Sequence, residues 1–211
     1  MYNGKTERNN KRVKNQRRIG GIKLTVFAMC GSFCTLSDAF AELKKLKEAQ
    51  HDIIPVVSEK VYSTDTRFGL ASDHVSNLED VCGKTVIHTV AAAEPIGPKL
   101  KPDIMVICPC TGNTLAKLAN GITDSSVTMA AKAHLRNGKP LVICLATNDA
   151  LSANLVNIGK LIARKNIYFV PMMQDDPIKK PTSLVADFTK LGETMELAMK
   201  GRQIMPVFLG K

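Results

Sequence analysis

Two short runs of uninterrupted apolar residues, at 104–108 and 141–146, place the tightest limit on the fold of this chain. A strand with one face in water alternates apolar and polar side chains, whereas a strand covered by helices on both faces is apolar throughout. Both runs have the length of a strand, and helical patterns fill the sequence between them. Parallel strands need a long crossover of this kind. The sequence therefore predicts a parallel sheet that is buried between helices.

Other segments continue the alternation of strand and helix. Further strands are expected at 24–29, 53–57 and 167–170, with a short one at 85–88, and Pro55 favours an edge position or a strand start for its segment. Helices are expected near 35–46, 69–81, 113–120, 124–137, 154–164 and 184–199. This order predicts an α/β fold with a three-layer, Rossmann-like, doubly wound parallel sheet and right-handed crossovers.

The net charge of +10 is concentrated at the start of the chain, because residues 1–23 hold eight Lys or Arg against one acid, Glu7. We expect residues 1–20 to form a disordered basic tail and residues 21–211 to form one α/β domain. A basic tail can also contact nucleic acid or anionic lipid. A solubilising extension is the simpler interpretation, and no nucleic-acid partner is predicted.

The apolar run from Leu24 to Cys30 follows this basic segment, as the apolar part of a signal peptide would. It contains Thr25 and ends at Gly31 and Ser32, and no later segment reaches the roughly 20 apolar residues that a membrane span needs. We therefore expect a strand here and a cytoplasmic protein without a membrane partner. The six cysteines form no CxxC pair, which favours structural thiols over a metal or disulfide framework.

Ligands of such sheets bind beyond the carboxyl ends of the strands, so the residues after each strand are the candidate site. The loop after 24–29 combines a Gly with hydroxyl side chains at a helix start, which suits a phosphate group. It is not a GxGxxG fingerprint, and an ordinary helix cap would explain it equally well. Ser58 follows the second strand, either as a ligand of phosphate or ribitol or as a turn residue. The candidate cofactor-binding residues of the first loop are Gly31, Ser32, Phe33 and Thr35.

The segment from Pro109 to Asp124 is the most specific motif in the chain. It resembles the Pro-x-Ser-x-Asn-Thr-x-x-Lys-x-x-x-Gly-x-x-Asp signature of the FMN-binding cysteine decarboxylase family, which includes phosphopantothenoylcysteine decarboxylases and flavin prenyltransferases. Thr111 stands where that family usually has Ser, and Asn113 matches its Asn. The resemblance implies a flavoprotein fold and FMN as cofactor, held at the first loop and at Ser58, Thr111, Gly112, Asn113, Thr114 and Ala146.

Segments 63–69, 94–99, 147–151 and 174–181 narrow the resemblance to the B subunits of dipicolinate synthases, over about residues 22–210. This resemblance implies oxidation of dihydrodipicolinate to dipicolinate (pyridine-2,6-dicarboxylate) in the mother cell of a sporulating bacterium. It also implies a partner, the A subunit of dipicolinate synthase, which would be a dehydrogenase that uses NADP(H). A homo-oligomer is expected as well.

A dicarboxylate substrate needs fixed cations. Arg67 is the best candidate, because a guanidinium can hold a carboxylate through two parallel hydrogen bonds. Lys117 is a further candidate, but on its predicted helix it is better explained as a solvated surface charge. The predicted substrate-binding residues are Arg67, Lys99, Asn148 and Lys180, and the predicted catalytic residues are Asn113 and Arg67.

Two departures from the decarboxylase pattern argue against cysteine decarboxylation. The residues 145–148 read Leu-Ala-Thr-Asn where decarboxylases usually have Pro-Ala-Met-Asn. His74 and His88 lie in a helical pattern and a short strand, where a structural role is more common than catalysis. Three functions stay open: a flavin-dependent redox subunit, a partner subunit that has lost flavin, and a flavin-dependent decarboxylase or prenyltransferase.

We predict that residues 1–20 can be removed without loss of folding, because they show no apolar periodicity that a core could use. A chain that begins at Gly21 should keep its solubility, its melting temperature and its binding of the A subunit. Circular dichroism and co-purification with the A subunit would check this. Loss of solubility or of the partner would show that the tail has a specific role.

Overall fold

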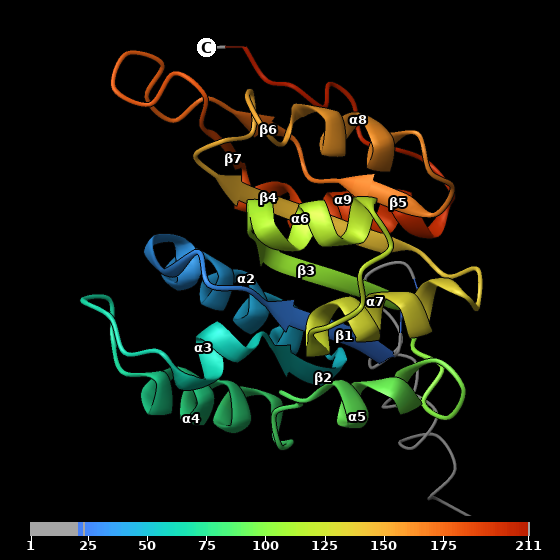
Figure 1. The fold of residues 1–211 in the computed structure, drawn as a ribbon. Coiled ribbons are helices and arrows are strands. Elements are labelled where there is room, and N and C mark those ends of the chain that lie inside the picture. The colour runs from blue at the N-terminus through green and yellow to red at the C-terminus, as the bar shows by residue number, and fades with distance from the viewer. Residues whose placement is uncertain (1–20, 23, 211) are drawn as a thin grey trace, which may run out of the picture.

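The computed structural model describes residues 21–22 and 24–210, so the predicted tail lies outside the described part of the chain (Figure 1). Four parallel strands form the centre of the sheet, in the order β2 (Asp52–Val57), β1 (Leu24–Met29), β3 (Ile104–Cys110) and β4 (Leu141–Thr147). The α/β fold and its parallel central strands are therefore confirmed.

Pro55 has the edge position that the sequence predicts, because β2 is the outermost of these strands. The expected strand at 85–88 is wrong: it is reduced to one bridge, in which the N–H of Ile87 donates to the carbonyl of Pro55 and the carbonyl of Ile87 accepts from Val57. Gly83 ends a helix just before this segment and Thr89 caps another just after it, so too little chain is left for a ladder.

The other edge of the sheet is mixed rather than purely parallel. The first half of β4 pairs with the parallel strand β5 (Ile167–Phe169), and its last two residues pair with the antiparallel strand β7 (Leu184–Ala186). Strand β6 (Met172–Met173) pairs with β7 in turn. The helix predicted at 184–199 is therefore wrong in its first third. Because β4 extends beyond β5, its backbone groups need a partner there, and the short segment 184–186 provides one.

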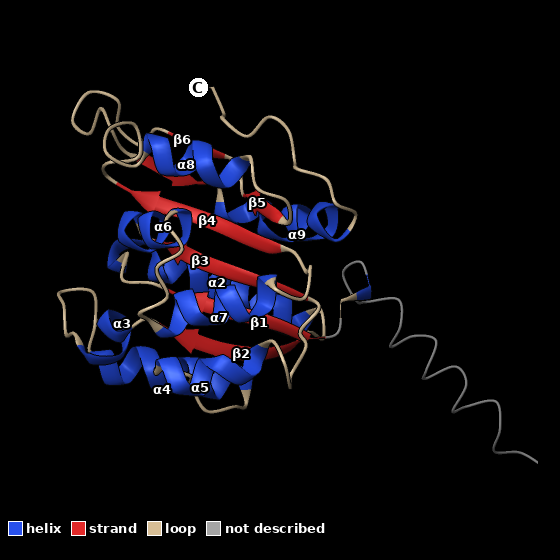
Figure 2. Cartoon of the chain, turned by 45° about the vertical axis from the view of Figure 1, so that its right-hand side comes forward, coloured by secondary structure: helices blue, strands red, loops and turns tan. Residues whose placement is uncertain are grey.

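Helices cover both faces of the sheet, as predicted (Figure 2). On one face lie α2 (Leu36–Glu48) and α9 (Leu191–Met199). The short 3₁₀-helix η4 (Phe188–Lys190) directly precedes α9. On the other lie α6 (Gly112–Ala119), α7 (Ser126–Leu135) and α8 (Leu155–Ile162). Near β2 and α7 the chain forms α3 (Glu59–Ser63), α4 (Ala71–Cys82), α5 (Val90–Ala93) and η3 (Glu94–Ile96), while η2 (Phe33–Thr35) precedes α2.

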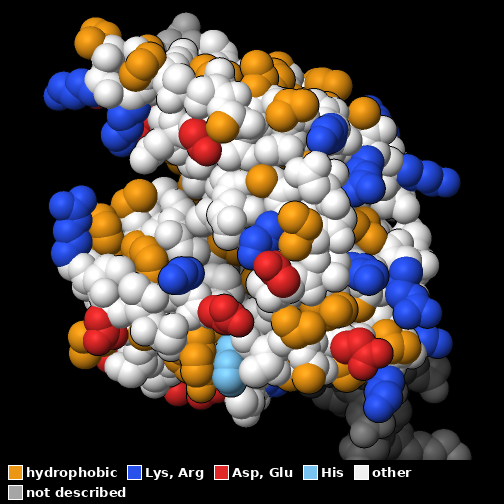
Figure 3. All heavy atoms as spheres, in the orientation of Figure 1, with side chains coloured by type: hydrophobic (Ala, Val, Ile, Leu, Met, Phe, Trp, Pro, Cys, Tyr) orange, Lys and Arg blue, Asp and Glu red, His pale blue; other side chains and the backbone are white. Residues whose placement is uncertain are grey.

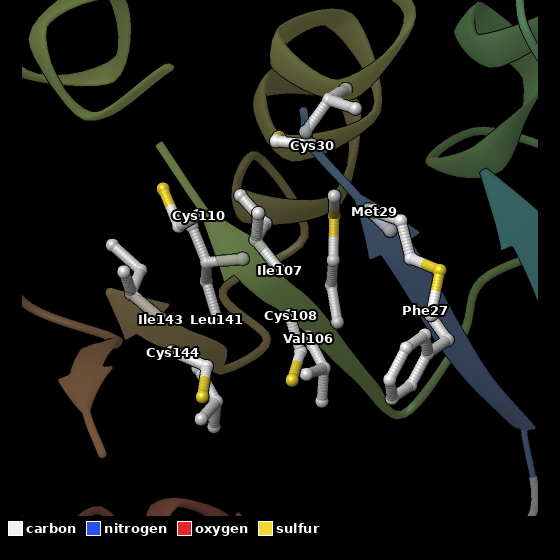
Figure 4. Packing of buried hydrophobic residues seen from close by; sticks show 14 of the residues in the cluster. Phe27, Met29, Cys30, Val106, Ile107, Cys108, Cys110, Leu141, Ile143 and Cys144 are labelled. Atoms are coloured by element: carbon white, nitrogen blue, oxygen red, sulfur yellow. The ribbon is translucent and has the colours of Figure 1, made fainter. Parts of the chain in front are cut away.

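Short side chains pack the core between the sheet and its helices. Val106 and Cys108 point to one face of β3 and Ile107 to the other (Figure 4). Cys30, Cys108, Cys110 and Cys144 are fully buried and free, as small apolar residues would be. Burial raises the pKa of the Cys30 thiol to about 11, so this sulfur stays neutral at physiological pH. No helix within 21–22 and 24–210 is long and apolar enough to cross a bilayer.

Two glycines give opposite predictions for stability. A Cβ on Gly97 would clash with the carbonyl oxygen of Ala133 in α7, whereas a Cβ on Gly159, within α8, would meet open space. Gly97→Ala should lower the free energy of unfolding by about 1–3 kcal/mol through overpacking. Gly159→Ala should raise it by about 0.5–1 kcal/mol, because alanine loses less backbone entropy in a helix. Urea denaturation of both variants measures the free energy of unfolding. Equal changes in the two variants would contradict the close contact at Gly97.

Candidate functional site

The sheet reverses its order between β1 and β3, since the chain runs from β1 outward to β2 and then back across to β3. The loops that leave β1 and β3 therefore diverge at the carboxyl ends of the strands, where this fold binds ligands. A cleft of about 600 Å³ opens at this point, between the loop after β1 and the segment that connects β6 with β7. Figure 3 shows the notch on the left-hand side of the molecule.

Sequence-predicted residues from four separate segments meet in this cleft. They come from the loops after β1 and β3, from the end of β4 and from the segment before β7. The eight predicted residues that line the cleft are Gly31, Ser32, Phe33, Thr35, Thr111, Ala146, Asn148 and Lys180. Residues more than a hundred positions apart in the sequence thus form one surface.

The loop after β1 is held closed by its own polar groups. The Oγ1 of Thr35 donates to the carbonyl of Ser32 at 2.9 Å and to its Oγ at 3.1 Å. Gly31 has little room for a side chain, because a Cβ there would lie 3.2 Å from the ring of Phe33 and 3.3 Å from the Cβ of Lys60. The loop is therefore held by its own contacts, and a helix start follows it directly.

The start of α6 is tied to the end of β1. Thr111 caps the helix by accepting from the N–H of Thr114, and the Oγ1 of Thr114 donates to the Sγ of Cys30 at 3.2 Å. The N–H of Cys30 donates to the carbonyl of Pro109 at 3.1 Å. These bonds connect the loops after β1 and β3, so the two predicted cofactor loops form one unit.

Three predicted cofactor residues lie beside the cleft rather than on its wall. Gly112 is buried, and a Cβ there would lie 2.6 Å from Thr147 Oγ1 and 2.7 Å from Asp149 Oδ1. Thr114 is buried below it, where it supports the loop. Asn113 is exposed on the first turn of α6 and makes no side-chain hydrogen bond to another described residue.

Ser58 lies behind the loop after β1, because its N–H donates to the carbonyl of Met29 at 2.9 Å. Its Oγ is buried and has no hydrogen-bond partner within the described part of the chain. A buried hydroxyl without a partner is unfavourable. Ser58 does not line the cleft, but its unpaired hydroxyl keeps it a candidate for contact with a ligand.

The predicted substrate cations have three different placements. Arg67 is exposed, and its guanidinium carbon lies 4.8 Å from the centre of the Phe68 ring, which lines the cleft. Lys180 lines the cleft but pairs with Asp175 at 2.7 Å. Their hydrogen bond raises the pKa of Lys180 and lowers that of Asp175, so both stay charged and neutralise each other. Arg67 does not line the cleft itself but lies beside it, against Phe68, and it forms no ion pair with a described carboxylate.

Lys99 does not reach the cleft, contrary to the expectation that it binds substrate. It is exposed in the turn after η3, just before β3 begins, and so lies at the amino ends of the strands. Asn137, which follows α7, donates to the carbonyl of Gly97 at 2.8 Å and fixes the turn there. The tight contact of Gly97 with α7 gives the physical reason.

Lys117 and Asp124, the Lys and Asp of the signature, pair with each other. Their Nζ and Oδ1 atoms lie 2.8 Å apart, and the hydrogen bond from Lys117 lowers the pKa of Asp124. The pair closes the connection between α6 and α7 at the surface. This geometry agrees with the interpretation of Lys117 as a surface charge rather than a substrate ligand.

Sequence reasoning missed five residues that line the cleft. Phe68 was visible only as the neighbour of Arg67, and Asp175 only in the same segment as Lys180, while Val185 falls in a segment predicted as helix. The others are Cys34, next to the predicted Thr35, and Thr147, next to the predicted Ala146. A check on the immediate neighbours of each candidate would have found three of the five, but Asp175 lies five positions before Lys180, and Val185 depends on the antiparallel pairing of β7 with β4.

The residues present fit FMN. The cleft volume falls in the range of about 300–1,000 Å³ that is usual for ligand pockets. A Gly- and hydroxyl-containing loop at a helix start suits the phosphate, and the free hydroxyl of Ser58 suits a polar tail. Phe33 and Phe68 offer rings to a planar group. Within the described residues, no group of three or more His, Cys, Asp or Glu is placed to hold a metal ion.

Comparisons with known proteins identify the family of the chain. The model of the family named Flavoprotein matches residues 12–196. The dipicolinate synthase B subunit of Bacillus subtilis (strain 168) is 45% identical over 183 residues, which is 87% of this chain and 92% of that protein. The crystal structure of the dipicolinate synthase B subunit from Bacillus halodurans C has a TM-score of 0.83 at 44% identity, over 92% of this chain and 99% of that one.

A more distant structure shares only the fold. The FMN-dependent cysteine decarboxylase SpaF has a TM-score of 0.62 at 21% identity, over 85% of this chain and 98% of that chain. The likeness covers the central sheet and its helices. Because the family model spans most of the sequence and the similar Bacillus subtilis protein is covered almost completely, this chain belongs to the flavoprotein family.

Proposed function

We propose that this chain is the B subunit of a dipicolinate synthase, which binds FMN in its cleft and acts with the A subunit to oxidise dihydrodipicolinate to dipicolinate. The observation that carries the proposal is the cleft itself, which gathers eight of the residues that the sequence predicts. The similarity to a dipicolinate synthase B subunit over almost its whole length supports the choice of reaction. The redox class, the partner and the substrate are parts of this proposal.

Different residues of the chain would bind different parts of the cofactor. Ser32 and the amides at the start of η2 and α2 would hold the phosphate, with Thr111 facing them across the cleft. Ser58 would offer its free hydroxyl to the ribitol. When bound, FMN supplies a two-electron acceptor for the hydride that leaves a dihydropyridine as it becomes aromatic. NADP(H) on the A subunit would exchange these electrons with the complex.

Arg67 would hold a carboxylate of the substrate. Its guanidinium lies on the face of Phe68, which orients the side chain while leaving its N–H groups free. Lys180 contributes less to anion binding, because Asp175 already neutralises it. Asn113 would act from the exposed first turn of α6, through its donor and acceptor groups. A proton must leave the ring together with the hydride; Arg67 and Lys180 are already protonated and the amide of Asn113 is not a base, so this proton would pass to water.

We predict that FMN raises the melting temperature of the full chain, because a ligand that binds only the native state stabilises it. Thr111 and Thr89 allow a matched test, since each caps a helix by accepting from the N–H three residues later, but only Thr111 lines the cleft. Both Thr→Ala variants should lose about 1 kcal/mol of stability through the lost cap. Only Thr111→Ala should weaken FMN binding in a fluorescence titration. An unchanged melting temperature at saturating FMN would support a subunit that has lost flavin.

We also predict that Arg67 and Asn113 have separable effects. Arg67→Ala should weaken substrate or transition-state binding by about 2–4 kcal/mol without changing FMN affinity, and Arg67→Lys should recover part of the loss. Asn113→Ala should weaken FMN binding and turnover together. Turnover of dihydrodipicolinate by the complex of both subunits, with FMN titration alongside, measures both. Lys99→Ala is the control and should behave as wild type, whereas full turnover by Arg67→Ala would exclude the carboxylate role.

A further inference from the structure

A second cavity, of about 520 Å³, lies between α2 and α4 next to the cleft. The two cavities share three lining residues, Phe33, Cys34 and Phe68. The two cavities therefore adjoin, and a small molecule in the second cavity would lie next to a ligand in the cleft.

The inner wall of this cavity holds an imidazole without a hydrogen-bond partner. His74 is only 9% exposed, and its Nε2 is buried and unpaired within the described part of the chain. Its ring centre lies 6.4 Å from those of Phe33 and Phe40, and it is nearly parallel to the Phe40 ring. Gly69, at φ +137°, covers the Nε2 edge, where a Cβ would lie 3.1 Å from the nitrogen. A buried polar group of this kind is unfavourable unless a ligand or water satisfies it.

Charges around the cavity favour an anion at one end. Lys44 lines the cavity and forms no ion pair with a described carboxylate. Its neighbour Lys45 pairs with Glu42 at 2.6 Å, and both of these line a different cavity. Asn77 adds an amide, while Asp80 also lines the cavity and opposes an anion near itself. A carboxylate would therefore bind on the Lys44 side.

We propose that this cavity binds the ring of the substrate, a small planar dicarboxylate, beside the flavin cleft. This inference rests on the proposed function and assigns its substrate subsite. Three phenylalanines, Phe33, Phe40 and Phe68, line the cavity and suit a flat ring. Lys44 and His74 would receive one carboxylate. The other would face Arg67, which lies on the shared residue Phe68.

Calorimetric titration of the FMN-loaded full chain with pyridine-2,6-dicarboxylate tests the subsite. Lys44→Met keeps the aliphatic stem and removes the charge, and His74→Phe keeps an aromatic ring and removes the nitrogen. Each should raise the dissociation constant of the dicarboxylate by about ten- to a hundredfold, the size expected for a lost hydrogen bond to a charged group. Lys45→Met, the matched control, should leave it unchanged. All three variants should bind FMN as wild type does.

The outcomes separate this inference from the proposed function. Dicarboxylate binding that both cavity variants leave intact would overturn the subsite, as would the absence of binding to wild type. An equal loss of FMN and dicarboxylate affinity would also overturn it, because the cavity would then hold the cofactor. If the chain binds no FMN but the variants still lose dicarboxylate binding, the subsite stands and the flavin proposal fails. Since Lys44 is not part of the core, Lys44→Met decides the question even if His74→Phe does not fold.

Discussion

The contact between the end of β1 and the start of α6 is the interaction on which the rest of the site depends. Thr114 donates to the Cys30 sulfur, and the Cys30 N–H donates to Pro109, so the loops after β1 and β3 are held as one unit at the reversal point of the sheet. Complete burial of Cys30 raises its thiol pKa to about 11. The sulfur therefore remains neutral, and no buried charge disturbs the junction at physiological pH.

The opposite wall of the cleft depends on a departure from the parallel sheet. Because β5 covers only the first half of β4, the backbone of Ala146 and Thr147 needs another partner and finds it in Val185 and Leu184 of β7. This antiparallel pairing brings Val185 into the cleft and anchors the segment before it, which carries Asp175 and Lys180. Local backbone pairing thus sets the position of the outer wall.

Sequence patterns predict the parts of this protein that depend on neighbours along the chain. The apolar runs of β3 and β4, and the hydroxyl-rich loops that follow strands, are properties of short segments, and the fold rules then bring those loops together. The strand β7 was missed because three residues are too few to show a periodicity. Lys99 precedes the strand predicted at 104–108, so the same fold rule already places it at the amino ends of the strands, away from the cleft.

Ion pairs within the chain reduce the number of cations that could bind the proposed dicarboxylate. Lys180 and Lys117 were plausible from the sequence, but Asp175 and Asp124 neutralise them, and an exposed pair of this kind adds little binding energy for a further anion. Arg67 and Lys44 have no carboxylate partner among the described residues; Lys44 lines the second cavity, and Arg67 lies against Phe68, which lines both cavities. A molecule with two carboxylates on one flat ring matches two separate cations around an aromatic wall. Two anionic groups on a flexible chain would gain less from the rings, because they would lose more conformational freedom on binding.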